Sequence, residues 1–147
     1  MAREFLRSGG VAEYIDRAAR QHRAAFRGSA TLGNQAAIDE LAEIWNECRS
    51  ADWDGHGALP VEQATLRMAY NLIDNLPIGF PRPSIGAEPD GQLTLEWWRT
   101  PHRILSISVD PAGFLHYAGL FGMNRRYGTL TYFSSAPDEL LQLVREL

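Results

Sequence analysis

The chain contains no lysine, and all 14 of its basic residues are arginine. It therefore has no Schiff-base lysine, no lysine for a phosphate-binding P-loop and no Ser–Lys dyad. Its single cysteine, Cys48, permits no internal disulfide, so a reducing compartment and a cytoplasmic location are expected. No apolar run approaches the roughly 18 residues of a membrane span, so no membrane association is predicted.

Positive charge is scarce outside the first part of the chain. Residues 1–27 carry six arginines against three acidic residues, a net charge of +3, whereas the remainder has a net charge of −7. The total of −4 argues against a dedicated nucleic-acid-binding protein, whose surface is normally basic. Arg20, Arg23 and Arg27 recur at helical spacing and could contact phosphates or an acidic partner. Nucleic-acid binding is therefore an alternative, but not the favoured one.

The apolar pattern divides the chain into a helical part and a strand part. Helical spacing predicts helices over 11–27, 35–49 and 60–76. From residue 92 the period becomes 2, which predicts strands over 92–98, 103–109, 114–120 and 128–133. The proline-rich connector 78–89 should be ordered, with at most a short edge strand near Ile85. A short helix over 137–147 is expected at the end of the chain.

These elements predict an α+β fold: three N-terminal helices, a four-stranded antiparallel meander and a short C-terminal helix. The strands should be antiparallel because their connections are too short for parallel crossovers. A chain of 147 residues fits one domain, 1–147. We expect it to comprise an N-terminal helical extension (1–30), a helix pair with a corner (34–77), the sheet (83–133) and the C-terminal helix (135–147).

The segment ADWDGHGALPVE, residues 51–62, holds the first candidate site. Asp52, Asp54 and His56 alternate along the loop, as ligands do in calcium-binding loops. Joined by Glu96, they would define a metal-binding or hydrolytic site. The loop lacks the downstream bidentate glutamate of an EF-hand, and three adjacent ligands rarely complete a coordination shell.

A structural role for this segment is the favoured interpretation. Aspartate side chains would accept backbone hydrogen bonds, the glycines would adopt positive φ, and a tryptophan would pack into the core. The structural role is assigned to five residues of the corner and to two residues of the first predicted strand. They are Trp53, Asp54, Gly55, Gly57 and Pro60 in the corner, and Glu96 and Trp97 in the strand. No metal site and no cofactor are predicted.

Acid–base chemistry has few candidates. His102 and His116 belong to neighbouring predicted strands and are expected to lie close together, with Glu96 beside them. A Ser–His–acid group is conceivable there, but polar residues on the solvated face of a meander need no function. The chain has no GxSxG nucleophile elbow, and Cys48 lies on a helix stripe where an inert thiol is expected. Catalysis is not favoured.

Aromatic residues concentrate in the predicted sheet. Trp97 and Trp98 are adjacent in one strand and must therefore point to opposite faces, so one is core and the other needs a cover. The loop 119–129 has the Phe, Met, Arg and Tyr content of an interface. The predicted interaction residues are Trp98, Phe121, Met123, Arg125, Arg126 and Tyr127, with Arg20, Arg23 and Arg27 as accessory contacts.

WDGHGALPV, followed after a helix by PDGQLTLEW, resembles a set of small bacterial proteins of unknown function. They share W-D-G-x-G-A-x-P and then a G-x-x-x-L-E-W strand, and the similarity covers residues 45 to about 122. The resemblance implies no activity. Such genes occur in mobile-element or toxin–antitoxin-like cassettes, which implies a partner of the inhibitor or antitoxin type. We therefore expect a non-catalytic cytoplasmic interaction protein that binds another protein or a second copy of itself.

Overall fold

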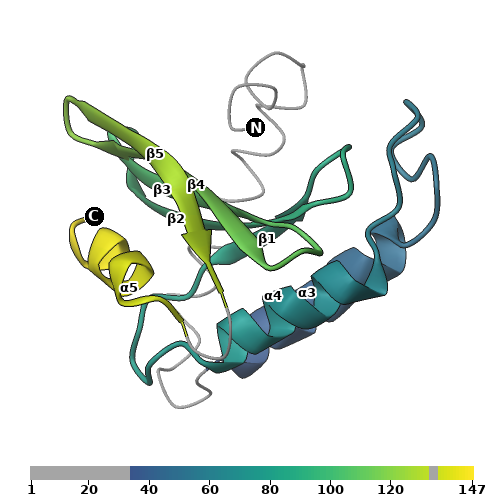
Figure 1. The fold of residues 1–147 in the computed structure, drawn as a ribbon, viewed down its shortest axis with the longest axis horizontal. Helices are drawn as coiled ribbons and strands as arrows, with labels where there is room; N and C mark the ends of the chain where they lie inside the picture. Colours follow the sequence, from purple (N-terminus) through teal and green to yellow (C-terminus); the bar gives the residue numbers. More distant parts are fainter. Residues whose placement is uncertain (1–33, 133–135) are drawn as a thin grey trace.

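The computed structural model describes residues 34–132 and 136–147. Within them, two helices precede the sheet, α3 (Gln35–Cys48) and α4 (Gln63–Asp74). The strands are β1 (Ser84–Ala87), β2 (Leu93–Thr100), β3 (Arg103–Val109), β4 (Phe114–Phe121) and β5 (Asn124–Thr131), and α5 (Asp138–Arg145) follows them. They form one sheet in the order β1-β2-β3-β4-β5, in which every neighbouring pair is antiparallel (Figure 1).

The α+β class and the antiparallel meander are confirmed, but two counts were wrong. The sheet has five strands and not four, because Ser84–Ala87 pairs with β2 as an edge strand. Three N-terminal helices do not fit either, since two precede the sheet in the described residues. The helix expected over 11–27 and the extension 1–30 lie outside those residues. None of the helices described is long and apolar enough to cross a membrane.

Helix α4 begins later in the sequence than predicted, after the corner that connects it to α3. Helix was expected from Pro60, but Glu62 is still extended, with ψ 153°, and α4 begins at Gln63. The Val61 N–H donates to the Cys48 carbonyl (2.9 Å), and the Leu59 N–H donates to the Pro89 carbonyl (2.8 Å). These two bonds hold residues 59–61 in an extended conformation beside the β1–β2 turn. In a helix starting at Pro60, the Val61 N–H would not reach the Cys48 carbonyl.

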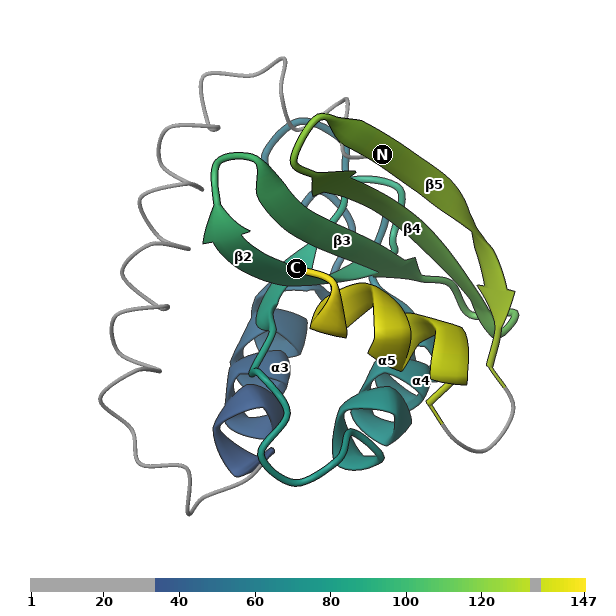
Figure 2. The ribbon, with the colours of Figure 1, turned by 90° about the vertical axis from the view of Figure 1, so that its left-hand side faces the viewer.

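One face of the sheet carries the core. Alternate residues along each strand point to it, so the buried apolar side chains of β2 and β3 follow the predicted period of two. Thr94, Glu96 and Ser108 on the opposite face are buried as well. The core residues contributed by β2, β3 and β4 are Leu93, Leu95, Trp97, Leu105, Ile107, Val109 and Leu115. Figure 2 shows α3, α4 and α5 together on this side of the sheet. We call the opposite side the outward face.

Helix α3 is rotated from the orientation that its apolar stripe predicts. That stripe consists of Ile38, Leu41, Ala42, Trp45 and Cys48. Ala42 is exposed, whereas Glu40 is buried. The Ile85 N–H at the outer edge of β1 donates to Glu40 Oε1 (3.1 Å), and Arg82 donates to Glu40 Oε2 (2.8 Å). The carboxylate thus bonds an edge strand 45 residues away in sequence, and this contact requires Glu40 to face the sheet.

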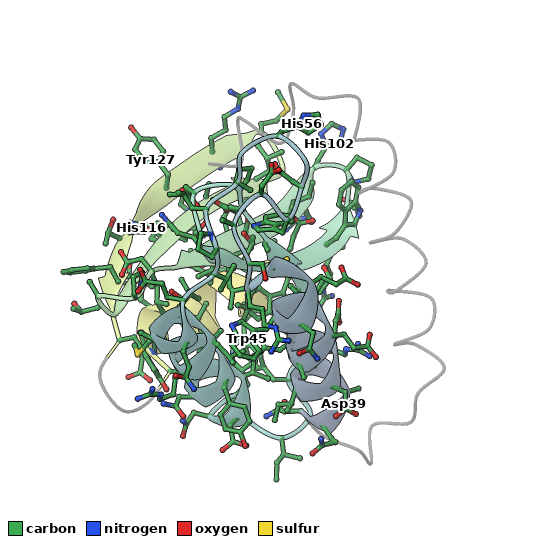
Figure 3. All side chains as sticks on the ribbon, turned by 90° about the vertical axis from the view of Figure 1, so that its right-hand side faces the viewer. Asp39, Trp45, His56, His102, His116 and Tyr127 are labelled. Atoms are coloured by element: carbon green, nitrogen blue, oxygen red, sulfur yellow. The ribbon has the colours of Figure 1, made fainter. Side chains whose placement is uncertain are left out.

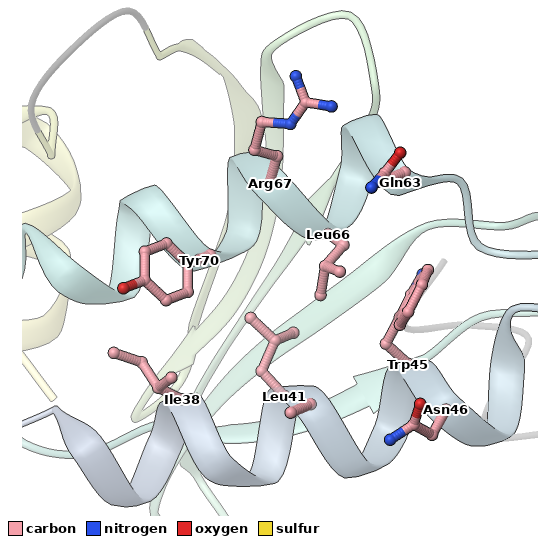
Figure 4. Close-up of a pocket in the computed structure, with 9 residues that line it drawn as sticks. Ile38, Leu41, Trp45, Asn46, Gln63, Leu66, Arg67 and Tyr70 are labelled. Atoms are coloured by element: carbon pink, nitrogen blue, oxygen red, sulfur yellow. The ribbon is translucent and has the colours of Figure 1, made fainter.

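The rotation leaves an apolar groove of about 440 Å³ between α3 and α4 (Figure 4). Ile38 and Trp45 line one wall, and Leu66 and Tyr70 line the other. The Trp45 Nε1–H is buried and has no hydrogen-bond partner among the described residues. Arg49 lies 5.5 Å from the centre of the Trp45 ring, within range of a cation–π contact.

Replacing Glu40 tests its bond to the β1 edge. We expect Glu40→Ala to lower the free energy of unfolding by about 1–3 kcal/mol, because it leaves the buried Ile85 N–H without an acceptor. Glu40→Gln keeps an acceptor oxygen and should lose less. Chemical denaturation measures both, with Glu43→Ala, an exposed acid on the same helix, as the control. Equal losses in Glu40→Ala and Glu43→Ala would contradict the role.

Candidate interaction surface

The outward face has an apolar half and a polar half. Cross-strand register places Trp98, Ile104 and Leu120 in one row that ends at Arg125. The next row holds Glu96, Ser106, Ala118 and Tyr127, and the row after it holds Thr94, Ser108, His116 and Thr129. We define the apolar patch as Trp98, Ile104, Ala118, Leu120 and Tyr127 of the outward face, together with Met123 of the adjoining β4–β5 turn.

Trp97 and Trp98 divide between the two faces as predicted. Trp97 is 2% exposed in the core, and its Nε1–H donates to the Pro81 carbonyl (2.7 Å). Trp98 is half-buried on the outward face. Two neighbours in the patch are far more exposed, Tyr127 at 84% and Met123 at 97%. In Figure 3 the Tyr127 side chain projects from the sheet away from the helices.

The β4–β5 hairpin presents the most exposed part of this surface. Its turn consists of Gly122, with φ 69°, and Met123, and the Gly122 N–H donates to the His102 carbonyl (2.8 Å). This bond attaches the hairpin to the β2–β3 turn. Arg125 is exposed, and no described carboxylate lies within ion-pair distance of it.

Two residues predicted for the interaction surface lie on the helix side. The Arg126 guanidinium stacks 4.2 Å from the Phe121 ring centre, and it pairs with Glu146. Arg103 also donates to the Glu146 carbonyl (2.9 Å), so both arginines attach the end of α5 to the sheet. The period of two could have placed Phe121 on the helix side. It is six residues, an even number, from the core residue Leu115 on the same strand, so both side chains point to the same face. Arg20, Arg23 and Arg27 lie outside the described residues.

The polar half of the outward face contains a buried carboxylate that the sequence analysis missed. Glu88 follows β1, and its Oε1 accepts hydrogen bonds from the hydroxyls of Thr94 and Ser108, both at 2.7 Å. All three side chains are buried. Glu96 is also buried on this face, and its carbonyl accepts a bond from the Ser84 hydroxyl (3.3 Å). The Glu88 carboxylate therefore bonds side chains of β2 and β3 and not the corner loop.

The expected proximity of His102 and His116 is wrong. His102 lies exposed in the β2–β3 turn, whereas His116 pairs across the sheet with Ser108 (Figure 3). His116 Nε2 is 2.9 Å from Asp110 Oδ2, and its Nδ1 is 3.1 Å from the Thr129 hydroxyl. The histidine therefore joins the β3–β4 turn to β5, a contact that no local pattern indicates.

Asp110 also organises its own turn. Its Oδ1 accepts bonds from the N–H groups of Ala112 (2.9 Å) and Phe114 (3.1 Å). Burial raises the pKa of this carboxyl, but the bonds from His116, Phe114 and Ala112 outweigh burial and hold the pKa below its usual range. The ionised form is thus the one that the fold stabilises.

The corner 51–62 uses its aspartates to bind its own backbone. Asp54 Oδ1 accepts from the N–H groups of His56 (2.8 Å) and Ala58 (3.0 Å), and Asp52 Oδ1 accepts from the Gly57 N–H (2.7 Å). The bond from His56 lowers the pKa of Asp54, partial desolvation opposes it, and the bond from Ala58 adds to the lowering. Over residues 34–132 and 136–147, no three His, Cys, Asp or Glu side chains converge as a metal ion requires.

The other residues of the corner have structural contacts. Gly55 and Gly57 adopt φ of 72° and 84°, as expected, and Asp52 shares this conformation at 60°. Trp53 is half-buried at the border of the core, and its Nε1–H donates to the Leu59 carbonyl (3.0 Å). A Cβ at Gly91 would lie 3.0 Å from the Pro60 carbonyl oxygen. Glycine at 91 therefore allows the two motif segments, 53–60 and 91–97, to touch.

Cys48 has no feature of a nucleophile. Burial, with a contribution from the Glu47 carboxylate, raises the pKa of the Cys48 thiol to about 11. The thiolate is the reactive form, so at neutral pH this side chain is a protonated core residue.

The corner bonds predict different effects for neighbouring polar residues. Asp54→Ala should lower the thermal midpoint, because it leaves two backbone N–H groups without their acceptor, and Asp54→Asn should lower it less. His56→Ala should change it little, since the exposed ring forms no hydrogen bond with the described residues and only attracts the Asp54 carboxylate. Differential scanning calorimetry measures all three. A His56→Ala loss as large as that of Asp54→Ala would refute the assignment.

The depressed pKa of Asp110 predicts a pH dependence of stability. Its contribution is fully present above the unfolded pKa of about 4 and is lost as pH falls through the lower folded pKa. Acidification from about pH 5 to about pH 2, through and below the unfolded pKa, should therefore destabilise the wild type more than Asp110→Asn. Denaturant titrations at each pH provide the comparison. Parallel curves for the two proteins would contradict the prediction.

Comparison with protein-family models, curated proteins and solved structures found no match to this chain. Its function is thus inferred from the outward face, the hairpin and the internal use of the polar groups.

Proposed function

We propose that the protein is a non-catalytic interaction module that binds another protein through the apolar patch of the outward face. The observation that carries the proposal is the combination of Trp98, Ile104 and Leu120 in one cross-strand row with the highly exposed Tyr127 and Met123 beside it. All three described helices lie on the other side of the sheet (Figure 2).

The chemistry of the patch suits protein recognition. Trp, Tyr and Met are enriched at interfaces, where they bury a large area. Tyr127 and Trp98 lie on strands, so their backbone is already ordered, and a tyrosine or tryptophan loses only two side-chain torsions on binding. Arg125 at the end of the row supplies a charged rim for a partner with acidic groups.

The polar groups support a binding function in preference to a catalytic one. Glu88 accepts two buried hydroxyl bonds, Asp54 accepts two backbone bonds, and Asp110 accepts bonds from a turn and from His116. Each carboxylate is used to hold the fold together. A cytoplasmic protein that inhibits its partner is the form of this function that the sequence resemblance favours.

Capture experiments with surface variants test the proposal. Met123→Ser/Tyr127→Ser removes the two exposed patch residues without touching the core, and Ile78→Ser/Tyr70→Ser is the control, exposed on the α4 side. The amount of protein captured from the native host should fall by roughly tenfold or more with the patch variant, because truncating one interface anchor such as Tyr127 costs about 2 kcal/mol or more. The control variant should capture the same proteins in the same amounts as the wild type.

Quantitative mass spectrometry provides the readout, and equal thermal midpoints show that both variants are folded. Retention of every partner by the patch variant would overturn the proposal, as would equal losses in the two variants.

A further inference from the structure

The two edges of the sheet differ in how they are protected. Edge strands expose rows of unpaired N–H and C=O groups and are natural sites for pairing with another chain. β1 has four residues, and Glu40 of α3 occupies its outward Ile85 N–H. β5 has eight residues, and no described helix or loop pairs with its outer side.

The register identifies which backbone groups of β5 point outward. The Tyr132 N–H donates to the Gly113 carbonyl (3.0 Å), and the β4–β5 pairing keeps this register along the strand. Residues with even numbers therefore bond to β4. The N–H and C=O groups of the odd-numbered residues point away from it, because bonding alternates along an antiparallel strand. These residues are Arg125, Tyr127, Thr129 and Thr131.

We propose that this edge pairs with the same edge of a second copy of the chain, forming a two-fold symmetric dimer with one continuous antiparallel sheet. The register that fits is centred on Gly128. It places Tyr127 across from Thr129 of the second copy, and Arg125 across from Thr131 of the second copy. Each facing pair exchanges two backbone bonds, about eight in total.

Charge is compatible with a second copy in this register, which is the one that pairs all four outward residues of β5. Like charges directly across a strand pair are destabilising. Arg126 is already paired with Glu146, so Arg125 is the charge that matters on this edge. In the register centred on Gly128, the two Arg125 residues stand about six residues apart, roughly 20 Å, beyond the Debye length of about 8 Å at physiological salt. Each faces a neutral threonine.

The β1 edge is less suited to pairing than the β5 edge. Pairing of β5 with β1 of another copy would be head-to-tail and open-ended, and the bond from Ile85 to Glu40 already takes one outward N–H of this four-residue strand. Pairing of β5 with β5 uses the same surface twice and closes after two chains. It also brings two apolar patches onto one sheet.

This inference goes beyond the proposed function, because the edge and the patch can fail independently. The experiment measures the oligomeric state of the full chain by sedimentation velocity over a concentration series. Thr131→Pro removes an outward N–H and leaves the ladder to β4 intact. It should raise the dimer dissociation constant by roughly tenfold, since each dimer loses two hydrogen bonds. Thr131→Ala retains both N–H groups and should dimerise as the wild type does.

A charge exchange tests the register itself. Thr131→Arg should weaken the dimer, because the introduced arginine faces Arg125 of the second copy. Arg125→Glu/Thr131→Arg should restore it, since opposite charges then face each other. The two positions are too far apart within one chain to pair, so the rescue reports contact between copies.

A wild type that stays monomeric at millimolar concentration would overturn the proposal, whether or not the patch binds a partner. A dimer that tolerates both Thr131→Pro and Thr131→Arg would also overturn it, because the copies would then meet elsewhere. Circular dichroism and the thermal midpoint confirm that each variant is folded.

Discussion

Burial of a single face of the antiparallel sheet against α3, α4 and α5 determines where the other features of the molecule lie. Leu95, Ile107 and Leu115 are fully buried in that layer, and each contributes roughly 1.5–3 kcal/mol of transfer free energy. Because side chains alternate strictly along a strand, fixing these residues also fixes their neighbours on the opposite face. The Trp98 row and Tyr127 are turned outward by the same packing that buries Trp97.

Carboxylates complete this arrangement at the borders of the sheet. Glu40 bonds the β1 edge, Glu88 bonds two hydroxyls of β2 and β3, and Asp110 bonds the β3–β4 turn and His116. A buried carboxylate is tolerated only with such donors, because its desolvation is costly. One consequence is that two of the polar candidates, Asp54 and His116, form hydrogen bonds within the fold. A second is that Glu40 takes one outward N–H of β1, whereas no described helix or loop pairs with the outer side of β5.

Local pattern predicted the faces of β2, β3 and β4, since a period of two needs no knowledge of distant residues. It also predicted the hydrogen-bonded corner, whose bonds span few residues. It allowed a short edge strand near Ile85 but did not count it in the sheet. It missed the rotation of α3 and the Glu88 site, because each depends on a partner that sequence spacing does not indicate: Ile85 for Glu40, and Ser108 for Glu88. For Phe121 and Arg126, the alternation along the strand could have placed both side chains on the helix side. The prediction instead relied on the interface-like composition of the segment 119–129.

Backbone amide exchange in β5, measured residue by residue by NMR at two protein concentrations, tests the central claim most directly. That claim is that the outward face of the sheet and the β5 edge are available to bind partners. At low concentration the amides of Tyr127, Thr129 and Thr131 should exchange quickly, while those of Arg126, Gly128 and Leu130, bonded to β4, exchange slowly. At high concentration the first set should become protected and the second should change little. Protection of both sets at every concentration, or of neither, would contradict the account.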